Sequence, residues 1–71
     1  MPKIPDGKKM VKNLEKYGFH IDRQSGSHVI LKNDKGLRMV VPVHAGKELK
    51  IGLYKSLLKD INLDEDQFWK I

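Results

Sequence analysis

Three histidines are the side chains of this chain best suited to acid–base chemistry near neutral pH. His20, His28 and His44 lie eight and sixteen residues apart, and these spacings match neither a zinc-protease helix nor a zinc finger. The chain has no cysteine, so thiolate ligands and disulfides are excluded. Its glycines are scattered singly and form no phosphate-binding loop. We therefore expect neither a metal nor a cofactor.

His28 differs from the other two because of the residues around it. It follows the turn-forming string Ser25-Gly26-Ser27 and begins the strand-like run His28 to Lys32. If Val29 and Leu31 face the core, alternation directs His28 to the open face of a sheet. The small residues before it leave room for a polymer backbone, such as a ribose–phosphate chain, to approach. A solvated histidine at the start of a strand fits the same spacing.

The other histidines and the lysines each allow two interpretations. His20 fits a solvated or hydrogen-bonded position on the polar side of a strand. His44 precedes a basic segment and could bind phosphate or cap the following helix. The lysines of the first predicted helix fit a solvated face. They form a surface for a polyanion only if Lys47, Lys50 and Lys55 lie on the same side.

Two main helices are predicted from hydrophobic residues at three- and four-residue spacing. The first begins at Pro5-Asp6-Gly7, runs to about Tyr17 and is stopped by Gly18. The second begins between Lys47 and Ile51. After it, Asp64 and Gln67 form a potential capping box. They predict a short helix from Glu65 to about Lys70 that covers the core with Phe68 or Trp69.

Between the main helices the hydrophobic period changes to two, as in strands. Phe19, Ile21 and Arg23 are predicted to share one face of a half-buried strand. The runs His28 to Lys32 and Leu37 to Val43 are predicted to form a hairpin. This order predicts an α+β fold, with a three-stranded antiparallel sheet covered on one face by the helices.

Length and charge limit what the chain can be. Its 71 residues allow one small domain, which we expect to span 1–71. Lysine and arginine number 14 against 9 acidic residues, so the formal charge is +5 and an anionic partner is favoured. No apolar run is long enough to span a membrane and the N-terminus lacks a signal-peptide core, so we expect no membrane partner and a cytoplasmic location.

Several short strings in this chain resemble the HicA toxins. They are Arg23 to His28 (RQSGSH), Val41 to His44 (VPVH), Gly46 to Leu49 (GKEL), and Gly52-Leu53 with Leu57-Leu58. The resemblance runs from the first predicted helix to about Leu63. The role of residues 64–71 stays open, because they are the least similar part.

HicA toxins are the small RNA-cleaving members of bacterial and archaeal HicA–HicB toxin–antitoxin modules. The resemblance implies a fold like the double-stranded-RNA-binding domain, an mRNA-cleaving endoribonuclease, and a HicB-type antitoxin that covers the active site in a hetero-oligomer. The family's catalytic histidine, in its Gly-Ser-His motif, corresponds to His28, with Ser27 beside it. The histidine of the Val-Pro-x-His motif corresponds to His44, whose role is less defined. Ile51 stands where relatives often carry proline, which touches no catalytic position.

RNA can be cleaved without a metal or cofactor when its own 2′-hydroxyl attacks the adjacent phosphate. His28 would then remove the hydroxyl proton or protonate the leaving oxygen. Lys47, Lys50 or Arg38 would stabilise the charge on the phosphorane, and His44 could carry a second proton. The alternative is a non-catalytic module that binds double-stranded RNA. In either case the expected RNA-binding residues are Lys9, Lys12, Arg38, Lys47, Lys50 and Lys55.

Overall fold

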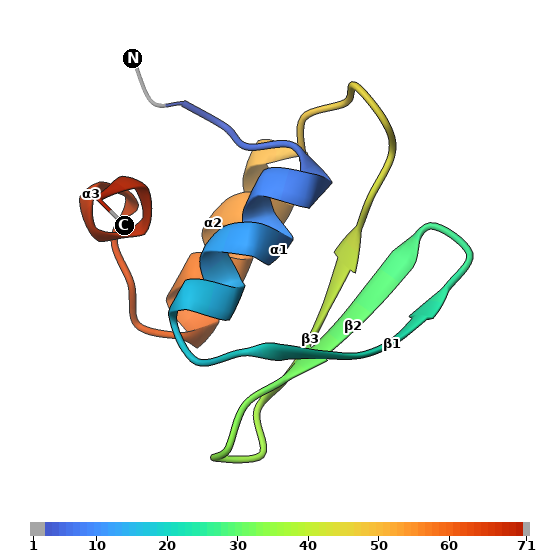
Figure 1. Cartoon of the computed structure of the whole chain (residues 1–71). Helices are drawn as coiled ribbons and strands as arrows, with labels where there is room; N and C mark the ends of the chain where they lie inside the picture. The colour runs from blue at the N-terminus through green and yellow to red at the C-terminus, as the bar shows by residue number, and fades with distance from the viewer. Residues whose placement is uncertain (1–2, 71) are drawn as a thin grey trace.

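The computed structural model describes residues 3–70, so the first two residues and the last residue of the predicted 1–71 domain lie outside it. Along the chain the elements are α1 (Gly7–Lys16), β1 (His20–Ser25), β2 (His28–Lys32), β3 (Arg38–Pro42), α2 (Ile51–Asp60) and α3 (Glu65–Trp69) (Figure 1). The strands form an antiparallel sheet in the order β1-β2-β3. The predicted α+β class and element order are confirmed, whereas the likeness to the double-stranded-RNA-binding domain stays a prediction.

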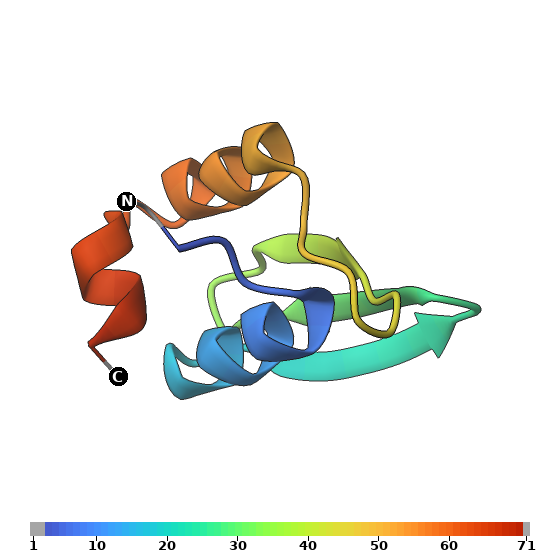
Figure 2. The same cartoon turned by 90° about the horizontal axis from the view of Figure 1, so that it is seen from above.

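Both main helices lie on one face of the sheet, and α3 lies on the far side of α1 and α2 from the strands (Figures 1 and 2). One face of the sheet therefore carries the core, and the opposite face is free of helices. None of the helices in the described part of the chain is long and apolar enough to cross a membrane.

The helix ends follow local signals in the sequence. Asp6 is the N-cap of α1, and its carboxylate accepts a hydrogen bond from the Lys9 backbone N–H at 2.8 Å. Gly18 ends the segment with φ of 94°, a conformation that costs little only for glycine. Asp64 and Gln67 form the predicted capping box of α3. The second helix begins at Ile51, the last residue of its predicted range.

The prediction for the first strand is wrong in two respects. Arg23 does not share a face with Ile21, because the register shifts between these two residues in a β-bulge. After the shift Arg23 lies opposite Ile30, whereas Ile21 lies opposite Leu31. Every residue of β1 is exposed, so this edge strand is not half-buried as predicted.

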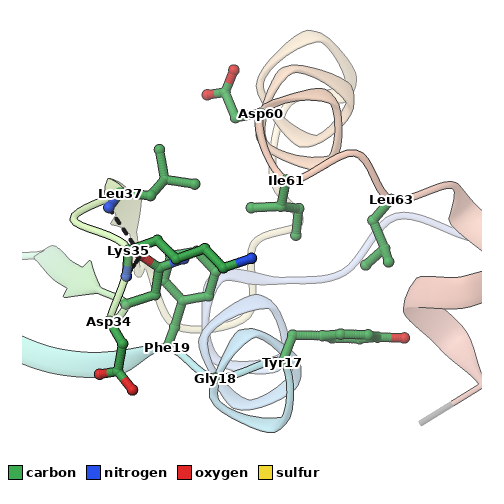
Figure 3. A pocket seen from close by; sticks show the side chains of 10 residues that line it. Tyr17, Gly18, Phe19, Asp34, Lys35, Leu37, Asp60, Ile61 and Leu63 are labelled. Atoms are coloured by element: carbon green, nitrogen blue, oxygen red, sulfur yellow. Dashed lines mark hydrogen bonds between the residues drawn. The ribbon is translucent and has the colours of Figure 1, made fainter.

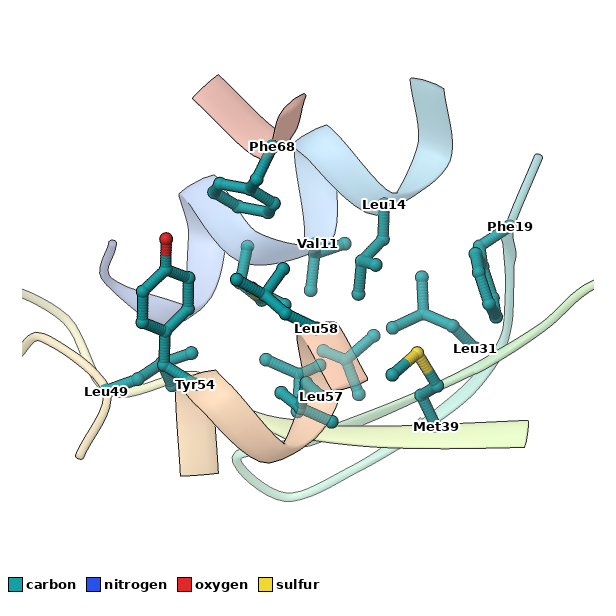
Figure 4. Packing of buried hydrophobic residues seen from close by; sticks show 13 residues of the cluster. Val11, Leu14, Phe19, Leu31, Met39, Leu49, Tyr54, Leu57, Leu58 and Phe68 are labelled. Carbon is teal, nitrogen blue, oxygen red and sulfur yellow. The ribbon is translucent and has the colours of Figure 1, made fainter. Parts of the chain in front are cut away.

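The core lies between the sheet and the helices and is closed by α3 (Figure 4). Phe68 is fully buried, and its ring meets the ring of Tyr54 edge-on at 5.6 Å. Asn13 of α1 donates a hydrogen bond from Nδ2 to the Phe68 carbonyl at 3.1 Å. The short helix α3 therefore contacts both α1 and α2. Of Phe68 and Trp69, Phe68 is the residue that lies inside the core.

Candidate active site

His28 lies at the first position of β2, directly after the Gly26–Ser27 turn, and its side chain is exposed. Val29 and Leu31 are both buried in the core cluster, so strand alternation places His28 on the face without helices. Its cross-strand neighbours are Ser25 on β1 and Pro42 on β3. An exposed imidazole at the end of a sheet, between two short side chains, is accessible to a large substrate.

The backbone around His28 is tied to the end of β3. The Val43 N–H donates a hydrogen bond to the Ser27 carbonyl at 2.6 Å. On the other side of this contact, a Cβ atom at Gly7 would lie 2.7 Å from the Val43 Cα, so the first turn of α1 rests directly on the β3 backbone. The turn that presents His28 is therefore bonded to the end of β3, which itself packs against the start of α1.

Pro42, the β3 neighbour of His28, also lines a pocket of about 390 Å³. We call this the His44 pocket; among its lining residues are Pro42, His44, Lys47, Glu48, Lys50 and Leu53. It brings together three of the predicted site residues, His44, Lys47 and Lys50. Because Pro42 pairs with His28 across the sheet, the His44 pocket adjoins the end of the sheet that carries His28.

The segment that carries His44, Lys47 and Lys50 is held near its C-terminal end. The Leu49 N–H donates a hydrogen bond to the Pro5 carbonyl at 2.9 Å, and Asp6 and Glu48 form an isolated antiparallel bridge. Leu49 itself is buried in the core. The basic segment is therefore packed against the N-terminal side of α1 and does not form a free loop.

Two predicted residues are not part of the His44 pocket. Arg38 lies opposite Lys32, four residues along β2 from His28, which corresponds to about 13 Å of strand. Arg38 therefore does not lie beside His28. Lys55 lines another pocket, together with Asp64 and Glu65. That Lys55 shares a surface with Lys47 and Lys50 stays a prediction.

Of the remaining predicted residues, Ser27 is half-buried, and Lys9 and Lys12 are exposed on α1. Lys9 lines a further pocket, of about 300 Å³, which we call the Trp69 pocket. Among its lining residues are Lys3, Asp6, Lys9, Gly46, Glu48 and Trp69. Lys3 and Trp69 were absent from the predicted site. No local pattern points to Lys3, and Trp69 was assigned with Phe68 to the cover of the core.

A pocket of about 440 Å³ lies at the opposite end of the sheet (Figure 3). Its apolar lining includes Phe19, Leu37 and Ile61, and the carboxylates of Asp34 and Asp60 lie beside them. It contains none of the predicted site residues. Lys35 also lines it, but the two carboxylates outnumber this one cation, which disfavours a polyanion there.

Burial changes the acidity of one side chain near the Trp69 pocket. The pKa of the Tyr54 hydroxyl is raised above its ordinary value of 10.0, chiefly because burial disfavours the charged form. The hydrogen bond that this hydroxyl accepts from Trp69 Nε1, at 3.1 Å, acts in the opposite direction. Tyr54 therefore acts as a neutral anchor for the indole.

Within residues 3–70, no three histidine or acidic side chains lie together as metal ligands would.

Most of the chain matches a known protein family. A family model described as the HicA toxin of bacterial toxin-antitoxin systems matches residues 7–63. The chain belongs to the HicA toxin family. It is accordingly the toxin of a toxin–antitoxin module and has an antitoxin as its partner. No curated protein matches the chain. The matched region contains His28 and the His44 pocket but ends before α3, so Lys3 and Trp69 lie outside it.

Proposed function

We propose that this toxin is an endoribonuclease that cleaves messenger RNA in the cytoplasm, with His28 as its catalytic residue. The observation that carries the proposal is the position of His28. It is an exposed imidazole at the end of the sheet, and its neighbour Pro42 also borders the pocket of Lys47 and Lys50. A proton carrier and two cations beside one polymer path suit phosphodiester cleavage.

The proposed reaction uses the substrate's own nucleophile. The 2′-oxygen forms a bond to the adjacent phosphorus and loses its proton, and the bond from phosphorus to the 5′-oxygen breaks as that oxygen gains a proton. The products are a 2′,3′-cyclic phosphate and a 5′-hydroxyl. His28 transfers one of these protons, and Lys47 and Lys50 stabilise the charge on the phosphorane. His44 is a candidate for the second proton transfer.

The test is cleavage of RNA by the purified toxin, with the histidines compared. Acid–base catalysis contributes about 10²- to 10⁴-fold, so His28→Ala should lose cleavage by that factor and keep RNA affinity. His20→Ala is the matched control, because His20 is exposed and lies opposite Lys32, at the other end of β2. A substrate with 2′-deoxyribose at the cleaved position should resist cleavage. Undiminished cleavage by His28→Ala would contradict the proposal.

The same assay separates the enzyme from a non-catalytic RNA-binding module. A module would bind RNA saturably and leave it intact, whereas the enzyme yields fragments with cyclic phosphate ends. In cells, expression of the toxin should arrest growth, and His28→Ala or co-expression of the neighbouring reading frame should relieve the arrest. Relief by the neighbouring reading frame would identify it as the antitoxin.

A further inference from the structure

Trp69 is held in one orientation at the edge of the core. Its Nε1 donates a hydrogen bond to the Tyr54 hydroxyl, and its ring meets the Phe68 ring edge-on, at 5.1 Å and 87°. Tyr54 and Phe68 are themselves fully buried. Trp69 is only half-buried and lines an open pocket with its remaining surface. A fixed indole beside a pocket is preorganised for binding, because little conformational entropy is lost when a flat ligand stacks on it.

Two cations lie close to this indole. The Lys3 Nζ is 5.0 Å from the ring centroid of Trp69, and the Lys9 Nζ is 6.0 Å from it. Lys3 precedes α1 and Lys9 lies in the first turn of α1, whereas Trp69 lies in α3, the last helix. Tertiary packing therefore places two flexible ammonium groups beside one aromatic ring, a combination that binds single-stranded nucleic acid.

The Trp69 pocket also contains carboxylates, which indicate what part of a ligand enters it. Asp6 and Glu48 both line the pocket, and Asp6 is occupied as the N-cap of α1. A phosphate inside the pocket would be repelled by these groups. A neutral aromatic base would not, and the flexible lysine side chains could reach the phosphates on either side of it.

The Trp69 pocket adjoins the candidate active site. Glu48 lines both this pocket and the His44 pocket, and Gly46 comes from the segment that carries Lys47 and Lys50. A strand that leaves His28 along the His44 pocket can therefore continue to Trp69. The two pockets therefore meet at Glu48.

We propose that Trp69 is a base-binding subsite for an unpaired nucleotide of the RNA substrate, with Lys3 and Lys9 binding the flanking phosphates. This inference rests on the proposed function and specifies its substrate class. A base within a duplex is already stacked and presents no free face to the indole. The substrate at this subsite is therefore single-stranded RNA.

The experiment uses the fact that Trp69 is the single tryptophan of the chain. The toxin is titrated with a short 2′-O-methyl oligonucleotide of mixed sequence, which has no free 2′-hydroxyl and stays intact. Saturable quenching of tryptophan emission is expected with the single strand, and little change is expected with the matching duplex. Binding without quenching, equal quenching by the duplex, or no binding at all would each overturn the proposal.

Variants separate stacking from a purely structural role of Trp69. Stacking of a base on an aromatic side chain corresponds to roughly 5- to 150-fold in affinity, so Trp69→Leu should weaken binding of a labelled oligonucleotide by that factor. Trp69→Phe should restore part of the loss. Tyr54→Phe removes the hydrogen bond that orients the indole but keeps the indole itself, so it should lose much less affinity than Trp69→Leu. Equal loss in Tyr54→Phe and Trp69→Leu would show that only packing matters.

The lysines give an independent readout. Lys3→Ala and Lys9→Ala should each weaken binding and lower the slope of log affinity against log salt by about 0.7, the value for one phosphate contact on a single strand. Lys59→Ala is the matched control, because Lys59 lines neither the Trp69 pocket nor the His44 pocket. Equal effects in all three variants would contradict a local contact.

Failure of this inference is distinguishable from failure of the proposed function. The binding measurements use an oligonucleotide that cannot be cleaved, so they do not depend on catalysis. Cleavage of RNA without quenching would keep the nuclease and remove the subsite. Quenching without cleavage would keep the subsite and remove the nuclease.

Discussion

Replacement of Gly7 by alanine tests how the start of α1 supports the candidate active site. A Cβ atom at Gly7 would lie 2.7 Å from the Val43 Cα and closer still to the Pro42 carbonyl oxygen. Both are backbone atoms at the end of β3, so no rotation of a side chain relieves the overlap. Either α1 or the end of β3 must move.

The expected cost follows from two opposing effects. Alanine is the better helix former by about 1 kcal/mol in a helix interior, and less is gained in the first turn. Overpacking costs typically about 1–3 kcal/mol, and the upper part of this range applies because the clash is with backbone. We expect Gly7→Ala to lower the free energy of unfolding by about 1–3 kcal/mol and Tm by roughly 5–20 °C.

Gly52→Ala is the matched control, because Gly52 lies in the first turn of α2 and a Cβ there meets nothing within 4 Å. This variant should be stabilised by about 0.4–1 kcal/mol. Urea and thermal denaturation of both variants and the wild type provide the measurement. If Gly7→Ala is as stable as wild type, the inferred contact between α1 and β3 is wrong.

The displacement should also affect catalysis below the melting transition. Val43 donates the hydrogen bond to the Ser27 carbonyl, and Ser27 precedes His28. Movement of β3 at Val43 therefore shifts the turn that presents the imidazole. We expect folded Gly7→Ala to cleave RNA more slowly than folded Gly52→Ala at the same temperature.

Two further predictions concern the aromatic side of the core. Burial raises the pKa of Tyr54 in the folded protein, so the neutral phenol contributes to the free energy of unfolding. This contribution is fully present below pH 10.0, the ordinary pKa, and is lost as pH rises through the folded-state pKa. Urea denaturation across this alkaline range should show a smaller fall in stability for Tyr54→Phe than for wild type; parallel curves would contradict it. Phe68→Ala should cost about 3–5 kcal/mol, because Phe68 is fully buried between α1 and α2, and Phe68→Leu should recover much of this in calorimetry. A marginal effect of Phe68→Ala would show that α3 is not part of the core.

The features predicted correctly from the sequence depend on interactions between near neighbours. The Asp6 cap of α1 joins residues three positions apart, and the Gly18 stop depends on a single backbone angle. The capping box of Asp64 and Gln67 is equally local. The open-face position of His28 needed only the alternation of buried residues in one strand.

The first strand shows where local reasoning failed. Hydrophobic alternation placed Ile21 and Arg23 on one face, but the bulge between them puts them on opposite faces. Lys32 on β2 pairs with Asp22 at this irregularity, with 3.6 Å between Nζ and Oδ2. A bulge depends on the register with the partner strand, which the first strand alone does not encode.

Propensity, spacing and charge over a few residues were enough to predict the element order, the caps and the histidine that begins β2. The grouping of charges from distant segments could not be predicted in this way. Lys47 and Lys50 share a pocket with His44, Lys55 lines a different one, and Lys3 meets Trp69 from the opposite end of the chain. The physical reason is that burial of Phe68 and Leu49 in one core brings distant segments together, and no short-range pattern records that contact.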